Sequence, residues 1–285
     1  MHIPAGLGEI AANYDVLLCD IWGVIHNGVS ADPSACAALE RWTRERGPVV
    51  LISNSPRPSP EVITQLDALK VPRQAWSAIV TSGDATRELL ARRAPGRAFR
   101  IGPGRDDPLY SGLGLVFAPL GDAAFIACSG PDDDERETPE DYRQILTEAA
   151  AHGLEMICAN PDIVVQRGDR LIYCGGALAR LYQELGGVAL MAGKPHSPIY
   201  ALALDQARAL CSSVLSNDRI LAIGDGLATD ISGANQAELD ALFIANGIHG
   251  GPALFDHGAL REGAVERLLA DHGLTARFAM AALAW

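Results

Sequence analysis

Five polar side chains stand just after short apolar runs of this chain, and together they could carry out phosphoryl transfer. The five are Asp20, Ser53, Lys194, Asp225 and Asp230. A carboxylate can attack phosphorus as a nucleophile, and two or three carboxylates with carbonyl oxygens form a site that suits Mg²⁺. A hydroxyl and an ammonium group can hold the phosphoryl oxygens as charge redistributes. Each residue also has a plain structural interpretation, as a turn residue, a helix cap or a surface charge.

The apolar runs that precede these residues are too short for helices. They suit strands that are buried on both faces of a parallel sheet. Apolar residues at helical spacing follow over residues 33–46 and from residue 59 or 60 onward. The resulting order of strand, helix, strand, helix, strand predicts a doubly wound α/β fold. Strand ends of one such sheet converge on one face, so we expect the five polar residues to share a site.

The middle of the chain follows a different pattern. Residues 96–188 contain several short strand candidates and two helical stretches, and we predict that they form a smaller α/β domain. Residues 1–95 and 189–285 would then make up the core, with Val188–Met191 leading back into it. The acidic segment 130–137 is expected to be a solvated surface turn, and the tail, residues 264–285, is expected to be helical.

The bulk composition narrows the class of protein. The chain has 285 residues, enough for one large or two moderate domains. Its formal net charge of -12 argues against broad nucleic-acid binding and against adsorption to an anionic membrane. The six cysteines form no CxxC pair, and no zinc pattern is present. With no secretory signal and no apolar stretch of about 20 residues, we expect a cytoplasmic protein.

In order and spacing, these motifs resemble all four motifs of the haloacid dehalogenase (HAD) superfamily of phosphatases. Within it, the chain resembles subfamily IIA, which holds 4-nitrophenyl, pyridoxal, nucleotide and sugar phosphatases. That subfamily carries a large α/β cap, of the C2 type, inserted between the second and third motifs of a Rossmann-like core. The predicted insertion lies at that place. The segments Asn160-Pro-Asp162, Gly175-Gly-Ala-Leu178 and Gly193-Lys-Pro195 also look like the subfamily.

The resemblance implies hydrolysis of a small-molecule phosphate monoester through an aspartyl-phosphate, with Mg²⁺ as cofactor. Asp20 is similar to the nucleophile, whose second oxygen would bind the metal. The main-chain carbonyl of Trp22 and the carboxylate of Asp225 would be further ligands. Asp230 would bind the ion directly or through water.

The resemblance also implies which residues hold the substrate. Ser53 would hydrogen-bond the transferring phosphoryl group, and Lys194 would pair with Asp20 and with the phosphoryl charge. Asn54 and Asp162 complete the predicted substrate-binding set. The inserted domain would set specificity, with Arg167 and residues 173–178 as further contributors, but the sequence does not name the substrate. Caps of this subfamily often make dimer contacts, so a homodimer is possible.

One position departs from the family. A second Asp usually stands two residues after the nucleophile, protonates the leaving oxygen and then activates water, but here that residue is Trp22. General acid–base help is worth about 10²–10⁴ in rate. His26 is the nearest candidate to replace it, although the plainer interpretation is a residue that stabilises the turn. Trp22 therefore leaves open a rival hypothesis, a regulatory protein that binds a phosphorylated ligand without turnover.

Overall fold

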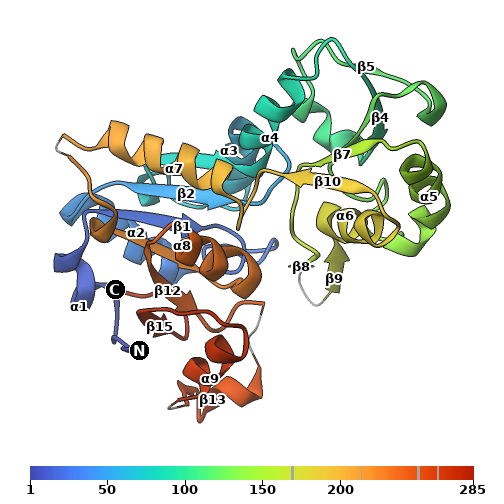
Figure 1. Cartoon of the computed structure of the whole chain (residues 1–285). Helices are drawn as coiled ribbons and strands as arrows, with labels where there is room; N and C mark the ends of the chain where they lie inside the picture. Colours follow the sequence, from blue (N-terminus) through green and yellow to red (C-terminus); the bar gives the residue numbers. More distant parts are fainter. Residues whose placement is uncertain (168–169, 213, 249–250, 262) are drawn as a thin grey trace. The chain divides into compact units, whose positions relative to one another are not determined.

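The computed structural model describes residues 1–167, 170–212, 214–248, 251–261 and 263–285. The chain divides into two compact units (Figure 1). Unit 1 comprises Met1–Ser53, Ile63–Val80 and Tyr200–Trp285, and unit 2 comprises Asn54–Val62 and Thr81–Ile199. The domain boundaries expected from the sequence, at 95/96 and 188/189, stay a prediction. None of the helices in the described ranges is long and apolar enough to cross a membrane.

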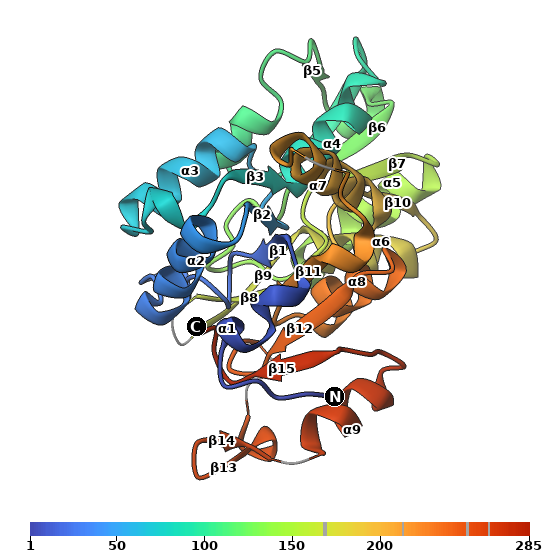
Figure 2. The same ribbon diagram turned by 90° about the vertical axis from the view of Figure 1, so that its left-hand side faces the viewer.

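Unit 1 is built on a six-stranded sheet whose strands all run parallel (Figure 2). Its order is β15 (Phe278–Met280), β12 (Asp240–Ile244), β11 (Ile220–Gly224), β1 (Val16–Asp20), β2 (Val49–Ser53) and β3 (Ala78–Thr81). All residues of the central strands β1, β2 and β11 are buried, as the apolar runs predicted. Helices on both faces of such a sheet explain why these strands show no polar alternation. The doubly wound α/β prediction is confirmed.

The helices around this sheet follow their sequence signals. They are α1 (Leu7–Ile10), α2 (Pro33–Glu45), α3 (Ser59–Ala68), α7 (Ser197–Leu210), α8 (Ser232–Gln236) and α9 (Ala264–Asp271). In α2, the Asp32 side chain accepts hydrogen bonds from the backbone N–H groups of Ser34 and Ala35 at the N-terminus. This N-cap satisfies donors that have no partner inside the helix. It also fixes where the loop after β1 ends.

The expectation of a helical tail is wrong beyond Asp271. Helix α9 ends there, and β15 follows as an edge strand that pairs with β12. A small antiparallel hairpin, β13 (Phe255–Asp256) with β14 (Ala259–Leu260), precedes α9. Phe278, Ala279 and Met280 are buried. A three-residue apolar run is too short to separate strand from helix by periodicity, so the open edge of β12 decided its structure.

Unit 2 has its own sheet of five parallel strands. Its order is β10 (Val188–Met191), β7 (Glu155–Cys158), β6 (Phe125–Cys128), β4 (Arg97–Ile101) and β5 (Val116–Phe117). A separate antiparallel hairpin pairs β8 (Val164–Arg167) with β9 (Arg170–Tyr173). Helices α4 (Ser82–Ala91), α5 (Arg143–Ala151) and α6 (Gly175–Glu184) belong to this unit. The strand Val188–Met191, expected to resume the core, is instead an edge strand of this second sheet.

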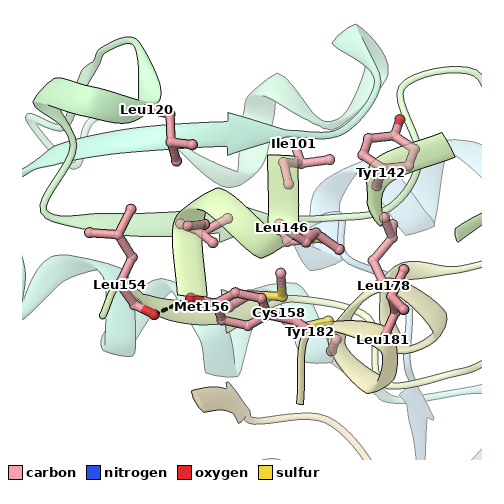
Figure 3. Close-up of a cluster of buried hydrophobic side chains, with 14 residues drawn as sticks. Ile101, Leu120, Tyr142, Leu146, Leu154, Met156, Cys158, Leu178, Leu181 and Tyr182 are labelled. Carbon is pink, nitrogen blue, oxygen red and sulfur yellow. Dashed lines mark hydrogen bonds between the residues drawn. The ribbon is translucent and has the colours of Figure 1, made fainter. Parts of the chain in front are cut away.

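A continuous apolar cluster fills the space between this sheet and helices α5 and α6 (Figure 3). Leu146 from α5, Met156 from β7 and Leu178 from α6 are fully buried in it. The hydroxyl of Tyr182 reaches the edge of the cluster and donates to the carbonyl of Leu154. Burial of a large apolar side chain contributes roughly 1.5–3 kcal/mol. This unit therefore has a core of its own, which can hold the loops at its strand ends in place.

Candidate active site

The carboxylates of Asp20, Asp225 and Asp230 form one cluster in unit 1. Each offers an oxygen atom, and these oxygens lie within 4.8 Å of one another. Asp20 is the last residue of β1, and Asp225 directly follows β11. Since Cys19 pairs with Ile223 in the adjacent strands, the two carboxylates come from neighbouring strand ends. The sequence-based expectation that these three residues meet agrees with this geometry.

Asp230 reaches the cluster from a π-helical turn, Leu227–Ile231. Its Oδ2 accepts a hydrogen bond from the N–H of Gly226 at 3.0 Å, which folds the side chain back toward the strand end. The sequence interpretation allowed Asp230 to be a helix N-cap. The structure does not make Asp230 an N-cap, because the N-cap residue of this turn is Gly226 and Asp230 lies within the turn.

Glycines make room for the cluster. A Cβ atom at Gly23 or at Gly247 would overlap the carboxylate of Asp225, and one at Gly224 would overlap that of Asp230. Gly23 also has a φ of 87°, in the left-handed region that glycine adopts readily. The N–H of Ile248 donates to Asp225 Oδ2 at 2.6 Å and holds that side chain. The backbone is thus shaped around the carboxylates.

This cluster fits a hard divalent cation. Three carboxylates that are each 5–6% exposed place like negative charges close together away from water. Such an arrangement is costly unless positive charge is supplied. Carboxylate oxygens are the ligands that Mg²⁺ and Ca²⁺ prefer. Among the described residues of unit 1, Asp20, Asp225 and Asp230 are therefore a group that could hold a metal ion.

Ser53 lies beside the cluster at the end of β2. Asp20 is level with Ile52 in the paired strands β1 and β2, so Ser53 stands one residue farther along. The side chain is buried, with 8% of the residue exposed. A hydroxyl at this strand end is suitably placed to donate to an oxygen of a group bound at Asp20. Its predicted contact with a phosphoryl group stays a prediction.

Trp22 occupies a compact loop after β1. Its ring packs edge-on against the imidazole of His26, with ring centroids 5.1 Å apart. A Cβ atom at Gly28, where φ is 84°, would overlap the same ring. The N–H of Gly23 donates to the carbonyl of His26 at 2.8 Å and closes the turn. The indole therefore has a packing role in this loop and offers no group for proton transfer.

His26 also has contacts typical of a turn residue. Its Nδ1 accepts a hydrogen bond from the N–H of Gly28 at 3.0 Å, and only 4% of the residue is exposed. Burial lowers the pKa of His26 to about 4. The ring is then neutral at pH 7 with one nitrogen occupied by the backbone, so it is a poor proton donor. These contacts favour the turn-stabilising interpretation over the catalytic one, which stays a prediction.

Unit 2 brings Asn54, Asp162 and Lys194 together. The Asn54 side chain accepts from the N–H of Lys194 at 2.7 Å and donates to the Lys194 carbonyl at 3.1 Å. The same amide nitrogen donates to Asp162 Oδ1 at 2.8 Å. A Cβ atom at Gly193 would collide with Asn54 Oδ1 and with Ser82 Oγ, so glycine is required beside this contact. We call these three hydrogen bonds the Asn54 clamp.

The Asn54 clamp changes the expected reason for the position of Lys194. The sequence argument placed Lys194 at a strand end of the same sheet as Asp20, but the preceding strand β10 belongs to the five-stranded sheet. Because Asn54 is bonded to Ser53, the clamp instead ties the Lys194 backbone to the residue that follows β2. The amide group bonds protein atoms through both its oxygen and its nitrogen, which favours a positioning role for Asn54. Its predicted substrate contact, like those of Asp162 and Lys194, stays a prediction.

The acidic segment 130–137 is more than the solvated turn expected from the sequence. Asp134, whose side chain is 9% exposed, forms ion pairs with Arg105 at 2.5 Å and with Arg167 at 3.0 Å. Asp132 accepts from the N–H of Gly102 at 2.7 Å. A run of charges has no periodicity that indicates distant partners, so these ion pairs could not be predicted from the sequence.

Family models match both parts of the chain that carry the site residues. A haloacid dehalogenase-like hydrolase model matches residues 17–115, and a HAD-hydrolase-like model matches residues 191–272. In structure, the chain is similar to a hydrolase of the haloacid dehalogenase-like family from Brucella suis 1330. The identity is 42%, 99% of this chain and 100% of that one are covered, and the TM-score is 0.88.

Among curated proteins, the chain is similar to the ribonucleotide monophosphatase NagD of Escherichia coli (strain K12). They are 26% identical over 81% of this chain and 88% of that protein. It is also similar to the 5'-nucleotidase YutF of Bacillus subtilis (strain 168), at 25% identity over 82% of this chain and 88% of that protein. Both similarities span most of the sequence.

Proposed function

The chain belongs to the haloacid dehalogenase-like hydrolase family, and we propose that it is a Mg²⁺-dependent phosphatase of small phosphate monoesters. The observation that carries the proposal is the cluster of Asp20, Asp225 and Asp230, buried at the ends of neighbouring strands. NagD and YutF, which are named as nucleotide phosphatases, support phosphoryl chemistry. Their identity of about a quarter leaves the substrate to be found.

Asp20, Asp225 and Asp230 would hold the cation, with the main-chain carbonyl of Trp22 as a further predicted ligand. When bound, the ion would supply positive charge to the phosphoryl oxygens and neutralise the carboxylates. Gly23 and Gly247 leave the space that the Asp225 carboxylate occupies. A side chain at either position would displace a predicted ligand.

Asp20 would act as the nucleophile. One of its oxygens forms a bond to phosphorus while the bond from phosphorus to the leaving oxygen breaks, and that oxygen departs with the electron pair. Ser53 would donate a hydrogen bond to a phosphoryl oxygen. Lys194, whose backbone the Asn54 clamp holds, would supply a positive charge to the same group. Water would then attack phosphorus, release inorganic phosphate and restore the Asp20 carboxylate.

Trp22 should make the two steps unequal. Departure of a stable anion such as 4-nitrophenolate needs no proton, so the first step can proceed without an acid at this position. Hydrolysis of the aspartyl-phosphate needs activation of water, which neither Trp22 nor the neutral, buried His26 supplies readily. We therefore expect a burst of 4-nitrophenolate followed by slow turnover, and much slower reaction of alkyl phosphates.

Rapid-quench kinetics with 4-nitrophenyl phosphate, with and without Mg²⁺, tests the proposal. Support would be a metal-dependent burst of about one equivalent per chain, with acid-stable phosphate retained on the protein and lost in Asp20→Asn. Fast turnover of alkyl and aryl phosphates without a burst would show that another residue supplies the proton. His26→Ala then reports whether that residue is His26.

A second candidate, a regulatory protein that binds a phosphorylated ligand, is favoured by the packing of Trp22 against His26 and Gly28. It predicts tight, metal-dependent binding of phosphate esters with neither a burst nor turnover. The same rapid-quench experiment separates the two functions, because only the phosphatase forms a covalent phosphoryl group.

A further inference from the structure

Three arginines of unit 2 lie in one neighbourhood. The acidic segment joins Arg105 to Arg167, because Oδ2 of Asp134 pairs with Nη2 of both side chains. Arg57 lies within electrostatic reach of both: burial is the main cause that lowers the pKa of Arg57, the charges of Arg105 and Arg167 lower it further, and Asp106 and Glu61 act in the opposite direction. Like charges held this close repel one another. Their positions must therefore be imposed by the fold.

The fold does impose them, starting at the Asn54 clamp. The chain runs three residues from Asn54 to Arg57, and five residues from Asp162 to Arg167 at the end of β8. Three residues span at most about 11 Å between Cα atoms. Since Asn54 and Asp162 are hydrogen-bonded at 2.8 Å, Arg57 and Arg167 lie on two segments that leave the same point. That point also holds the backbone of Lys194.

The segment with Arg57 is held against helix α4. The N–H of Gly83 donates to the carbonyl of Ser55 at 3.0 Å. A Cβ atom at Gly83 would overlap the carbonyl of Pro56 and lie 2.7 Å from the carbonyl carbon of Arg57. The N–H of Arg57 donates to Ser55 Oγ at 3.2 Å. The backbone that carries this guanidinium is thus fixed before any ligand arrives.

Arg105 and Arg167 have more donors than their shared carboxylate partner uses. Each guanidinium offers five N–H donors. Within the described part of the chain, Arg167 donates a hydrogen bond to Asp134 only, and Arg105 bonds the same carboxylate through Nη1 and Nη2. Their side chains are 50% exposed at Arg105 and 35% exposed at Arg167. Donor-bearing edges are thus open to an anion, and guanidinium groups match carboxylate and phosphate geometry.

We propose that Arg57, Arg105 and Arg167 form a second anion site that selects substrates with another negative group besides the phosphate to be hydrolysed. This rests on the proposed phosphatase function and names its substrate class, a small phosphate ester that also carries a carboxylate or second phosphate. Lys194 would face the phosphate that is removed. The three arginines would bind the other anionic end. Asp134 holds Arg105 and Arg167, and the contacts of Ser55 and Gly83 hold the backbone at Arg57, so little further ordering of the protein would be needed on binding.

Matched ligands that differ only in the second anion test the site. In the first pair, 3-phosphoglycerate carries a carboxylate where glycerol 3-phosphate carries a hydroxymethyl group. In the second pair, fructose 1,6-bisphosphate carries one phosphate more than fructose 6-phosphate. Titration calorimetry on the Mg²⁺-loaded Asp20→Asn protein measures their binding without turnover. We expect the more anionic member of at least one pair to bind ten or more times tighter. The pair that shows this preference identifies carboxylate or phosphate as the second group.

In the Asp20→Asn background, Arg57→Gln and Arg167→Gln should each reduce that preference about tenfold while glycerol 3-phosphate still binds. Arg180→Gln is the matched control, because Arg180 pairs with Glu184 on the exposed face of α6 in the same unit. It should leave the preference unchanged. Should a variant fail to fold by circular dichroism, Arg105→Gln replaces it.

Equal binding of both members of both pairs would overturn the second anion site, as would a preference that survives the arginine substitutions. Either result leaves the phosphatase proposal standing if 4-nitrophenyl phosphate still gives a burst. Absence of both a burst and steady-state turnover, with an intact preference, would instead overturn the phosphatase and keep the anion site.

Discussion

The two parallel sheets of this protein end in opposite charges. At the strand ends of unit 1, Asp20, Asp225 and Asp230 gather within 4.8 Å, with glycines clearing the space. In unit 2, Arg105 from the loop after β4 and Arg167 at the end of β8 gather around Asp134. Strand ends of open α/β sheets are where ligands bind. In the two proposals above, the same architecture thus carries a cation site in one unit and a set of anion-binding donors in the other.

The difference lies in how each cluster balances its charge. The arginines carry a carboxylate partner within the fold, so they can be held open for a reversible ligand. The three clustered carboxylates lie side by side and are buried, which favours an ion that stays bound. A chain of net charge -12 can therefore recognise anions where its few positive charges are concentrated.

The largest effect should come from the carboxylate cluster. Asp20→Asn removes the nucleophile and should reduce turnover of 4-nitrophenyl phosphate by about 10³-fold or more. Asp225→Asn removes an anionic ligand and should weaken Mg²⁺ binding in calorimetry together with activity.

Asp15→Asn is the control for these two variants. Asp15 precedes β1 and pairs with Arg219 at 2.6 Å, away from the strand ends. Unchanged Mg²⁺ affinity in Asp225→Asn would contradict the assignment of the cation site.

Trp22→Asp restores the carboxylate that the family carries at this position. Steady-state turnover of alkyl phosphates should rise, toward the 10²–10⁴-fold typical of acid–base help. The rise in turnover will be reduced because the variant loses the packing of the indole against His26 and Gly28. Thermal unfolding of the same variant measures the stability lost with this packing. Trp22→Asn introduces a side chain of nearly the same shape as Asp but without an acidic group. It should therefore have a thermal stability similar to that of Trp22→Asp and show no rise in turnover. A rise in both variants would point to relief of crowding instead.

His26 should make stability depend on pH. Burial lowers its pKa from about 6.5 to about 4, so the unfolded chain binds more protons than the folded one between these values. Stability from this residue is complete above pH 6.5 and is lost as the pH falls toward 4, by about 3 kcal/mol in all. Urea unfolding of wild type and His26→Asn across pH 7.5 to 4.5 should show a shallower slope in the variant. Parallel curves would mean that His26 titrates normally.

Asn54→Ala should have a smaller effect that combines stability and rate. It removes three hydrogen bonds and leaves the backbone of Lys194 without its partner, at a cost of about 1–3 kcal/mol. If the clamp positions Lys194, kcat/KM for 4-nitrophenyl phosphate should fall about tenfold.

Asn235→Ala provides the matched comparison. Its amide bonds the N–H and carbonyl of Thr275 in the same two-way manner, in unit 1. Loss of stability alone in both variants would limit Asn54 to a structural role.

The sequence by itself determined the strands that carry the carboxylates and the helices after them. Runs such as Val16–Cys19 must be apolar throughout because both faces of the strand are buried, and this pattern is local. Asp20 and Asp225 could be placed at one edge because strands of a parallel sheet end on the same side. The departure from the family pattern at Trp22 could also be seen in the sequence, because Trp22 stands two residues after Asp20.

Only the tertiary structure decided which sheet each short strand joined and which polar groups met. Val188–Met191 and Phe278–Met280 are apolar runs whose sequence does not state their neighbours, and hydrogen bonding to β7 and β12 settled them. The Asn54 clamp joins residues 108 and 140 positions apart, and Asp134 reaches Arg105 and Arg167 from a loop between them. A hydrogen bond or ion pair at such separation leaves no periodic trace in the sequence, because it depends on where two independently folded loops come to lie.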